Sequence, residues 1–250
     1  ELGGKIPCVV DHTARLRVAA RRIVFGKFLN CGQTCIAPDY ILVNESVKEA
    51  LISAMITAVE ESYGADESKS DDYGHIINIH HFDRLQNLLD RQRIRYGGKT
   101  IAKNRYIQPT LVEVSDTNNA LMEEEIFGPI LPILTYQTDE DLQTIIKQYE
   151  KPLSFYVFSK RKSWAKNLMQ TYSFGGGIIN DTLLQFTNRN LPFGGIGKSG
   201  MGAYHGKHSF YAFSHNKPYI QRSSWPDPSM RYAPYKKKMK FLKPLLKWLG

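Results

Sequence analysis

The sequence predicts a three-layer α/β fold, in which a mostly parallel β-sheet carries helices on both faces. Short apolar runs typical of buried strands alternate along the chain with segments whose apolar residues recur at helical spacing. The 250 residues are 42% hydrophobic, so a sizeable core can form in one large domain with small appendages. Alternation of strands with helices favours parallel strands, because each crossover helix returns the chain to the edge where the previous strand began.

The first half of the chain is expected to alternate helices with a buried strand. Apolar residues recur at helical spacing over residues 13–28, and the apolar run at 40–43 predicts a strand. Ser46 and Glu49 have the spacing of a capping box, which predicts that a helix opens there. A further helix is expected over 81–93.

The second half is expected to supply most of the sheet. Extended segments are expected at 106–114 and 132–136, and Thr138 with Asp141 predicts a helix start. The remaining expected elements, in order, are a strand at 155–158, a helix at 164–169, a strand at 177–180, an irregular glycine-rich loop at 191–206, an extended edge or bridging segment at 209–220 and a surface crossing at 223–234. A stretch as irregular as 191–206 is more often a functional loop than filler.

The net charge of +9 is concentrated at the C-terminal end of the chain. Six lysines and no acidic residue lie after residue 235, so the rest of the chain carries only +3 (9 − 6). No basic stripe with interleaved aromatic residues is present elsewhere, and we therefore expect no nucleic-acid partner. The sequence contains no run of about 18 apolar residues that predicts a membrane-spanning helix, and no secretory signal pattern at its start.

The three cysteines indicate a free thiol rather than a disulfide framework. Their odd, low count favours a reducing, cytoplasmic compartment. Cys31 and Cys35 are four residues apart, which is poor zinc spacing, and we expect no metal site. Cys35 ends a polar turn after the first helix, where backbone N–H groups could stabilise a thiolate. Taken alone, a small buried side chain is the simpler interpretation of Cys35.

Three further segments carry candidate chemistry, and each has a simpler explanation when taken alone. Glu1 stands before two glycines and could act as a general base if it were buried, but an exposed terminal acid is simpler. Glu125 and Phe127 place a carboxylate two residues from an aromatic ring, which suits the ribose and ring of a nucleotide or an acidic helix end. Residues 195–200 match G-x-G-x-x-G, but they follow no predicted strand, and we discount them as a dinucleotide fingerprint.

Taken together, four motifs in this order resemble those of the aldehyde dehydrogenase superfamily. They are Glu1-Leu-Gly-Gly-Lys5, Gly32-Gln-Thr-Cys35, Glu124-Glu-Ile-Phe-Gly-Pro129 and Leu191-Pro-Phe-Gly-Gly195. The 34-residue step from Glu1 to Cys35 is like the step between the family's base and its nucleophile. The segment 202–215 is similar to the class 3 branch, which includes fatty aldehyde dehydrogenases, and the likeness extends to about residue 235.

The resemblance implies a covalent mechanism for the oxidation of aldehydes to carboxylic acids. Cys35 would be the nucleophile that forms a thiohemiacetal and then a thioester, and Glu1 would activate the water that releases the acid. Glu125 and Phe127 would contact the nicotinamide end of NAD or NADP. The resemblance also implies substrate-pocket or active-site-loop positions for Thr34, Asn180, Phe193 and His205. A medium-chain, long-chain or aromatic aldehyde would be the substrate, and the full-length protein would be a homodimer.

The chain departs from the family pattern because it starts at the Glu1-Leu-Gly-Gly-Lys5 motif, which a nucleotide-binding half normally precedes. We therefore expect a catalytic domain at 1–207, a bridging strand at 208–223, and a C-terminal crossing with a basic tail at 224–250, without the N-terminal nucleotide-binding domain. Such a fragment would be inactive as a dehydrogenase or active only as an esterase. A thiol hydrolase that pairs Cys35 with a histidine, and a non-catalytic binding domain, are the remaining alternatives.

The lysine-rich tail has two interpretations that the sequence leaves open. Apolar residues fall near helical spacing among the lysines, namely Met239, Leu242, Leu245, Leu246 and Leu249. A basic amphipathic helix of this kind can lie on an anionic membrane surface, but a solvated helix packed on its own domain fits equally well. Pro244 would weaken or bend either helix.

Overall fold

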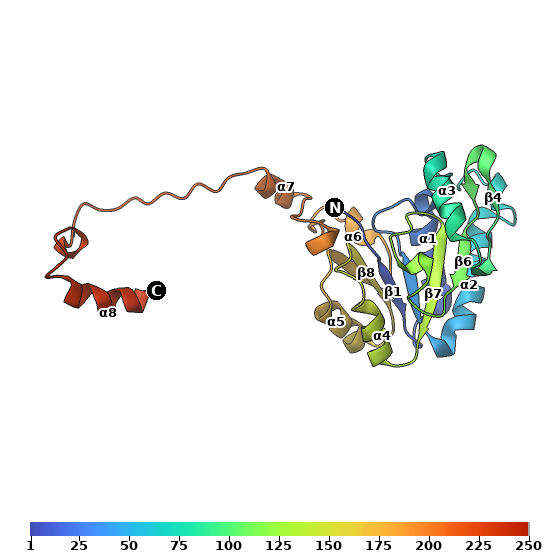
Figure 1. Ribbon diagram of the computed structural model, residues 1–250, viewed down its shortest axis with the longest axis horizontal. Coiled ribbons are helices and arrows are strands. Elements are labelled where there is room, and N and C mark those ends of the chain that lie inside the picture. The colour runs from blue at the N-terminus through green and yellow to red at the C-terminus, as the bar shows by residue number, and fades with distance from the viewer. Residues whose placement is uncertain (250) are drawn as a thin grey trace. The chain divides into compact units, whose positions relative to one another are not determined.

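The computed structural model describes residues 1–249, apart from the side chains of Phe241, Leu242, Leu245 and Leu249. The chain divides into two compact units, Glu1–Phe213 and Ser214–Gly250. The first unit contains the sheet and the helices that cover it (Figure 1). Within the described residues, no helix is both long and apolar enough to cross a membrane.

The elements follow one another largely as strands separated by helices. The helices are α1 Leu16–Phe28, α2 Lys48–Tyr63, α3 Ile79–Leu88, α4 Asp139–Ile146, α5 Lys162–Thr171, α6 Leu184–Thr187, α7 Lys207–Ala212 and α8 Met239–Leu249. The strands are β1 Pro7–Val10, β2 Tyr40–Asn44, β3 Arg93–Tyr96, β4 Thr100–Ile101, β5 Tyr106–Ile107, β6 Thr110–Glu113, β7 Ile130–Tyr136, β8 Ser154–Phe158 and β9 Gly176–Ile179.

The seven-stranded sheet has the order β3-β6-β7-β2-β1-β8-β9. Neighbouring strands are parallel, except that β3 pairs antiparallel with β6 at one edge. The crossover from β1 to β2 runs in one direction across the sheet, and those from β7 to β8 and from β8 to β9 run in the other. Right-handed crossovers therefore place α1 on one face and α4 and α5 on the other, which confirms the expected three-layer α/β fold.

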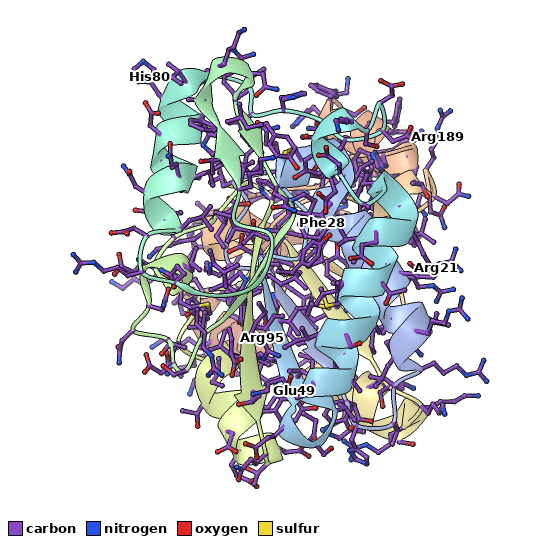
Figure 2. The ribbon with its side chains drawn as sticks, turned by 90° about the vertical axis from the view of Figure 1, so that its right-hand side faces the viewer. Arg21, Phe28, Glu49, His80, Arg95 and Arg189 are labelled. Carbon is purple, nitrogen blue, oxygen red and sulfur yellow. The ribbon has the colours of Figure 1, made fainter. Side chains whose placement is uncertain are left out.

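The core forms because the central strands are apolar along their whole length. All four residues of β1 and all five of β8 are buried, as parallel strands covered on both faces require. Helix α1 packs against α2 and buries its apolar stripe, so that Phe28 lies in the interior while Arg21 lies at the surface (Figure 2). At the antiparallel edge, Arg95 reaches Glu49 of α2 through hydrogen bonds of 2.6 and 3.2 Å (Figure 2).

One predicted helix start is confirmed and another is wrong. Thr138 and Asp141 form the expected reciprocal capping box at α4. The capping box expected at Ser46 and Glu49 does not form, because the Asn44 side chain accepts the Ser46 N–H at 3.2 Å and Glu49 pairs with Arg95 instead. A short 3-10 turn at Glu45–Val47 therefore leads into α2.

The strand expected within 208–223 is absent from the described residues. Residues up to Ala212 form helix α7, and no described strand pairs with residues 213–223. A strand needs the backbone groups of a neighbour, and none of the described strands pairs with that segment. The bridging role of the segment between subunits stays a prediction.

The second unit contains the expected C-terminal helix. Helix α8 starts after a 3-10 turn at Ser229–Arg231, and the Lys238 ammonium donates to the Ser229 and Tyr232 carbonyls at 2.6 and 2.8 Å. The helix includes Pro244. Leu242, Leu245 and Leu249, three of the apolar side chains on which the amphipathic prediction rests, lie outside the described side chains.

Candidate active site

Three of the four motifs meet at one edge of the sheet because of the strand order. Strands β7, β2 and β1 are adjacent and parallel, so the segments that precede them come to the same edge. Glu1 precedes β1, Cys35 precedes β2, and Glu125 with Phe127 precedes β7. This edge therefore holds the Cys35 thiol and the carboxylates of Glu1 and Glu125. In the sequence, Cys35 lies 34 residues after Glu1 (35 − 1), and Glu125 lies 90 residues after Cys35 (125 − 35).

A strained left-handed turn delivers Cys35 to this edge. After α1, Asn30 and Cys31 take φ values of +52° and +57°, and Gly32 takes +72°. Positive φ is unfavourable for non-glycine residues, so their surroundings must hold this conformation. At Gly32, a Cβ atom would lie 2.2 Å from the Gly128 carbonyl oxygen, which explains the glycine and joins this turn to the loop that carries Phe127.

Gln33 fixes the turn from the other side. Its side-chain amide donates to the carbonyls of Asn30 and His75, each at 3.1 Å, and its Oε1 accepts the Ile77 N–H at 2.9 Å. The Thr34 carbonyl accepts the Ala37 N–H at 3.0 Å, which closes the turn around Cys35. Thr34 is therefore part of the loop that contains Cys35, and its role in the active site stays a prediction.

The Cys35 thiol is half-buried among carboxylates. Burial raises its pKa, and the negative charges of Glu1 and Glu125 raise it further, while the Cys35 backbone N–H opposes them. Cys8 and Cys31 are fully buried, and burial raises the pKa of both thiols. Cys35 is thus the most accessible of the three thiols.

The Glu125 carboxylate lies directly against the Glu1-Leu-Gly-Gly-Lys5 motif. A Cβ atom on Gly3 would lie 2.3 Å from the Glu125 Oε2, and Gly3 also has a φ of +78°. Burial, and the neighbouring charge of Asp39, raise the pKa of Glu125 to about 7, although a hydrogen bond from the Gly4 N–H and two lysines oppose the shift. This carboxyl can therefore change charge near neutral pH.

Glu1 is exposed and is held by the glycine-rich loop. The Leu2 N–H donates to the Ser199 carbonyl at 2.8 Å. The Tyr204 hydroxyl hydrogen-bonds the Glu1 carboxylate, and burial together with this bond raises the pKa of Tyr204. Tyr204 is a site residue that the sequence analysis missed, since an isolated tyrosine in a loop carries no pattern.

Phe193 and His205 lie together beside Tyr204. Phe193 and Tyr204 exchange two backbone hydrogen bonds of 2.9 Å, and the Phe193 ring stacks on His205 with centroids 5.8 Å apart. An open cavity of about 380 Å³ runs from Glu1 along Phe193 and Tyr204 to Phe213. The aromatic wall makes this cavity suitable for an apolar chain.

Phe127 presents its ring to solvent at the same edge. The ring is 37% exposed, and the residue has a φ of +50°. His81 of α3 holds this conformation, because its Nε2 lies 2.6 Å from the Phe127 carbonyl oxygen. Sequence analysis missed His81, which lies 46 residues from its partner.

The side-chain hydrogen bonds of Asn180 do not involve Cys35, so its expected position in the substrate pocket or an active-site loop stays a prediction. Asn180 follows β9, and its side chain bonds the backbone of Ser159 after β8 at 2.8 and 2.9 Å. Both residues lie at the carboxyl ends of the parallel strands, whereas Cys35 precedes the amino end of β2. Asn180 therefore ties two strand ends together at the opposite edge.

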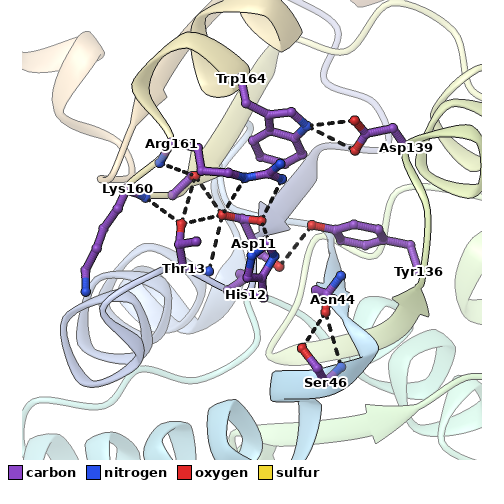
Figure 3. A network of polar contacts seen from close by, with 12 residues as sticks. Asp11, His12, Thr13, Asn44, Ser46, Tyr136, Asp139, Lys160, Arg161 and Trp164 are labelled. Carbon is purple, nitrogen blue, oxygen red and sulfur yellow. Dashed lines mark hydrogen bonds and ion pairs between the residues drawn. The ribbon is translucent and has the colours of Figure 1, made fainter.

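Ser159 belongs to a polar network at that opposite edge (Figure 3). The buried Asp11 carboxylate accepts hydrogen bonds from Arg161, Ser159 and Thr13 at 2.8, 2.8 and 2.5 Å. Burial alone would raise the pKa of Asp11, but these bonds outweigh it and lower the pKa to about 2. The carboxyl ends of β1 and β8, between which the strand order reverses, are thus joined by hydrogen bonds among the protein's own side chains.

The comparisons with known proteins identify the family of the chain. The sequence pattern described as "Aldehyde dehydrogenase family" matches residues 1–218. The chain belongs to the aldehyde dehydrogenase family. It is 50% identical over 249 residues to 4,4'-diaponeurosporen-aldehyde dehydrogenase of Staphylococcus aureus, covering 99% of this chain and 54% of that protein.

Relatives of the family 3 type support the class 3 likeness. Aldehyde dehydrogenase family 3 member A2 of Rattus norvegicus is 48% identical, over 87% of this chain and 45% of its own length. A solved structure, "Substrate bound state of Staphylococcus Aureus AldH", is 49% identical with a TM-score of 0.90, over 98% of this chain and 54% of that one. The chain therefore spans about half the length of the aldehyde dehydrogenases that it matches.

Proposed function

We propose that this chain is the catalytic part of an NAD- or NADP-dependent aldehyde dehydrogenase, with Cys35 as the nucleophile. The observation that carries the proposal is the convergence of Cys35, Glu1 and Glu125 from three motifs at one edge of the sheet. Family membership supports oxidoreductase chemistry on aldehydes. Within the described residues no histidine hydrogen-bonds Cys35, which argues against a cysteine–histidine hydrolase.

The residues of the chain divide the covalent chemistry between them. The Cys35 thiolate attacks the aldehyde carbon, and its backbone N–H is a donor for the oxygen that becomes negative. The carbon then loses a hydride, which leaves a thioester on Cys35. Glu1 takes a proton from water, whose oxygen attacks the thioester carbon, so that the acid leaves and the thiolate is restored.

The residues at the edge fit the nicotinamide end of a dinucleotide. When bound, NAD or NADP would supply the hydride acceptor for the Cys35 adduct. Glu125 offers a carboxylate for ribose hydroxyls, and the exposed Phe127 ring offers a flat apolar surface. Among the described residues, no turn from a strand into a helix is glycine-rich, so the pyrophosphate has no seat of the usual kind here.

Substrate, assembly and location follow as parts of the same proposal. The aromatic cavity beside Glu1 suits a medium-chain, long-chain or aromatic aldehyde. A relative in Canis lupus familiaris, 46% identical over 53% of its length, is named "dimeric NADP-preferring", which supports a homodimer of the full-length protein. Three free cysteines support a cytoplasmic location, and the lysine-rich tail supports contact with a membrane surface.

The test separates the two proposed catalytic groups in the full-length protein. In Glu1→Gln, the first turnover should still release NADH in a fast burst, but the steady rate should fall by about 100-fold, because only hydrolysis needs the base. Stopped-flow absorbance with a medium-chain aldehyde measures both phases. Steady turnover at the wild-type rate would remove Glu1 from the mechanism, and a burst retained in Cys35→Ser would remove Cys35.

Cleavage of an activated ester tests the alternative for the 250-residue chain alone. Ester cleavage through Cys35 and Glu1 needs no cofactor, so we expect slow ester hydrolysis without aldehyde oxidation. Calorimetric titration with NAD and NADP, beside an assay for NADH, decides the point. Tight binding with turnover would show that the described residues hold the dinucleotide by themselves.

A further inference from the structure

A buried cluster of three charged side chains lies behind the Glu125 loop and takes no part in the chemistry proposed above. Lys5 follows the two glycines of the first motif, Lys27 lies on α1, and Asp39 precedes β2. Their side chains are 5%, 1% and 4% exposed, respectively. Burying charge is costly unless the groups pair, so three such side chains together call for a structural or functional reason.

The cluster holds the Glu125 loop on both sides of Glu125. The Lys5 ammonium lies 2.5 Å from an Asp39 carboxylate oxygen and donates to the carbonyls of Leu121 and Glu124 at 2.6 and 3.1 Å. The other Asp39 oxygen accepts the Ile126 N–H at 3.0 Å. The residues before and after Glu125 are thereby fixed to one ion pair.

Lys27 is the member whose charge the ion pair does not need. Its ammonium lies 4.0 Å from Asp39, which is already paired with Lys5. Burial lowers the pKa of Lys27 to about 8, with Asp39 and Glu125 opposing this shift and Lys5 adding to it. Lys27 is thus a buried ammonium, 4.0 Å from Asp39, whose charge also interacts with the Glu125 carboxyl.

We propose that Lys5, Asp39 and Lys27 form a positioning cluster, in which the Lys5–Asp39 pair places Glu125 and Lys27 keeps its carboxylate charged. The charged groups that face Glu125 are Asp39, which disfavours the carboxylate, and Lys27 and Lys5, which favour it. The charge of Glu125 in turn acts on the Cys35 thiol. The binding of a dinucleotide by the Glu125 carboxylate rests on the function proposed above. The control of the Glu125 charge by the cluster does not rest on that function.

The reactivity of Cys35 reports the charge of Glu125 without any cofactor. As the pH rises past about 7, Glu125 becomes negative, and its charge disfavours ionisation of the Cys35 thiol. A plot of the rate of Cys35 alkylation by iodoacetamide against pH should therefore show a shoulder near pH 7. In full-length Lys27→Met, the loss of a nearby positive charge should move the shoulder up by about one pH unit. Lys27→Arg should leave it in place, and Glu125→Gln should abolish it.

Two controls keep the result interpretable. Lys48→Met removes a cation that pairs with Glu113 at the opposite edge, and its shoulder should match the wild type. Lys27→Met should melt no lower than the wild type at pH 7, because it removes a buried charge that is costly to maintain and leaves the Lys5–Asp39 pair intact. Should Lys27→Met fail to fold, Lys27→Gln takes its place.

The affinity for NAD separates this inference from the proposed function. At pH 7.5, Lys27→Met should bind NAD about threefold more weakly, because less of Glu125 is ionised. A shoulder that moves without a change in affinity supports the cluster and overturns the contact between Glu125 and the dinucleotide. A shoulder that stays fixed in Lys27→Met, or that persists in Glu125→Gln, overturns the cluster's role.

Discussion

At the scale of single residues, the geometry of the edge that carries Cys35 depends on glycines and on residues with positive φ, as well as on the reactive groups. Gly3 leaves room for the Glu125 carboxylate, and Gly32 leaves room for the Gly128 carbonyl. The motif residues around the reactive groups are therefore explained by close approach between segments far apart in sequence. Such contacts cannot be read from a single motif, because the partner atom belongs to another one.

The three thiols should differ sharply in their reactivity. Cys35 is half-buried in a polar turn, whereas burial raises the pKa of Cys31 to about 11 and that of Cys8 still further. Since the thiolate is the reacting form, iodoacetamide should label Cys35 at least about tenfold faster than either other cysteine. Peptide mass spectrometry of briefly treated native protein measures the order. Faster labelling of Cys31 or Cys8 would contradict this arrangement.

At the scale of elements, the adjacency of β7, β2 and β1 brings the reactive groups together. Apolar runs predicted β2 and β7, whereas β1 and the order of the strands in the sheet were not predicted. Order depends on long-range packing of helices on both faces, which local periodicity does not encode. Asn180 illustrates this, since knowing that it ends a strand does not say at which end of the sheet it lies.

The Asp11 network at the opposite edge should support stability and not catalysis. Asp11→Asn would leave Arg161 without its charged partner and should lower the free energy of unfolding by about 1–3 kcal/mol at pH 7. Because the folded-state pKa of Asp11 is lowered to about 2, its contribution is complete above about pH 4 and is lost as the pH falls toward 2.

Urea denaturation at pH 7 and pH 3 measures both effects of Asp11→Asn. The exposed Asp116 provides the matched control, and Asp116→Asn should change stability by less than about 0.5 kcal/mol. Equal stability of the two variants at pH 7 would mean that Arg161 and Ser159 find other partners. Ester cleavage by Cys35 should be unaffected at temperatures well below melting.

At the scale of the whole molecule, the chain divides into two compact units. The first unit holds the sheet and the candidate active site, and the second holds the lysine-rich helix α8. The described side chains of α8 include the exposed Leu246 and Trp248, beside exposed lysines. Apolar and basic side chains together suit an anionic membrane surface.

Deletion of residues 236–250 should weaken binding to vesicles that contain anionic phospholipid. Lysines near such a surface contribute about 1 kcal/mol each, so replacing Lys240, Lys243 and Lys247 by glutamine should lower the partition coefficient by at least about tenfold. Zwitterionic vesicles and added salt provide the controls, because both remove the electrostatic attraction. Co-sedimentation unchanged by the deletion would end the membrane proposal.

The sequence by itself determined the α/β fold class, several of the strands and the family, because apolar periodicity and short motifs are local properties, but it did not predict β1 or β3. It also identified Cys35, Glu1, Glu125 and Phe127 as the residues to examine, through the motifs that contain them. Only the tertiary structure decided which of these residues meet, since sheet order sets which loops share an edge. It alone revealed the charged cluster behind Glu125, whose members Lys5, Lys27 and Asp39 come from three segments. Lys27, on the buried face of α1, was a local sign of this cluster, because a charged side chain at an apolar position needs a partner of opposite charge from another segment.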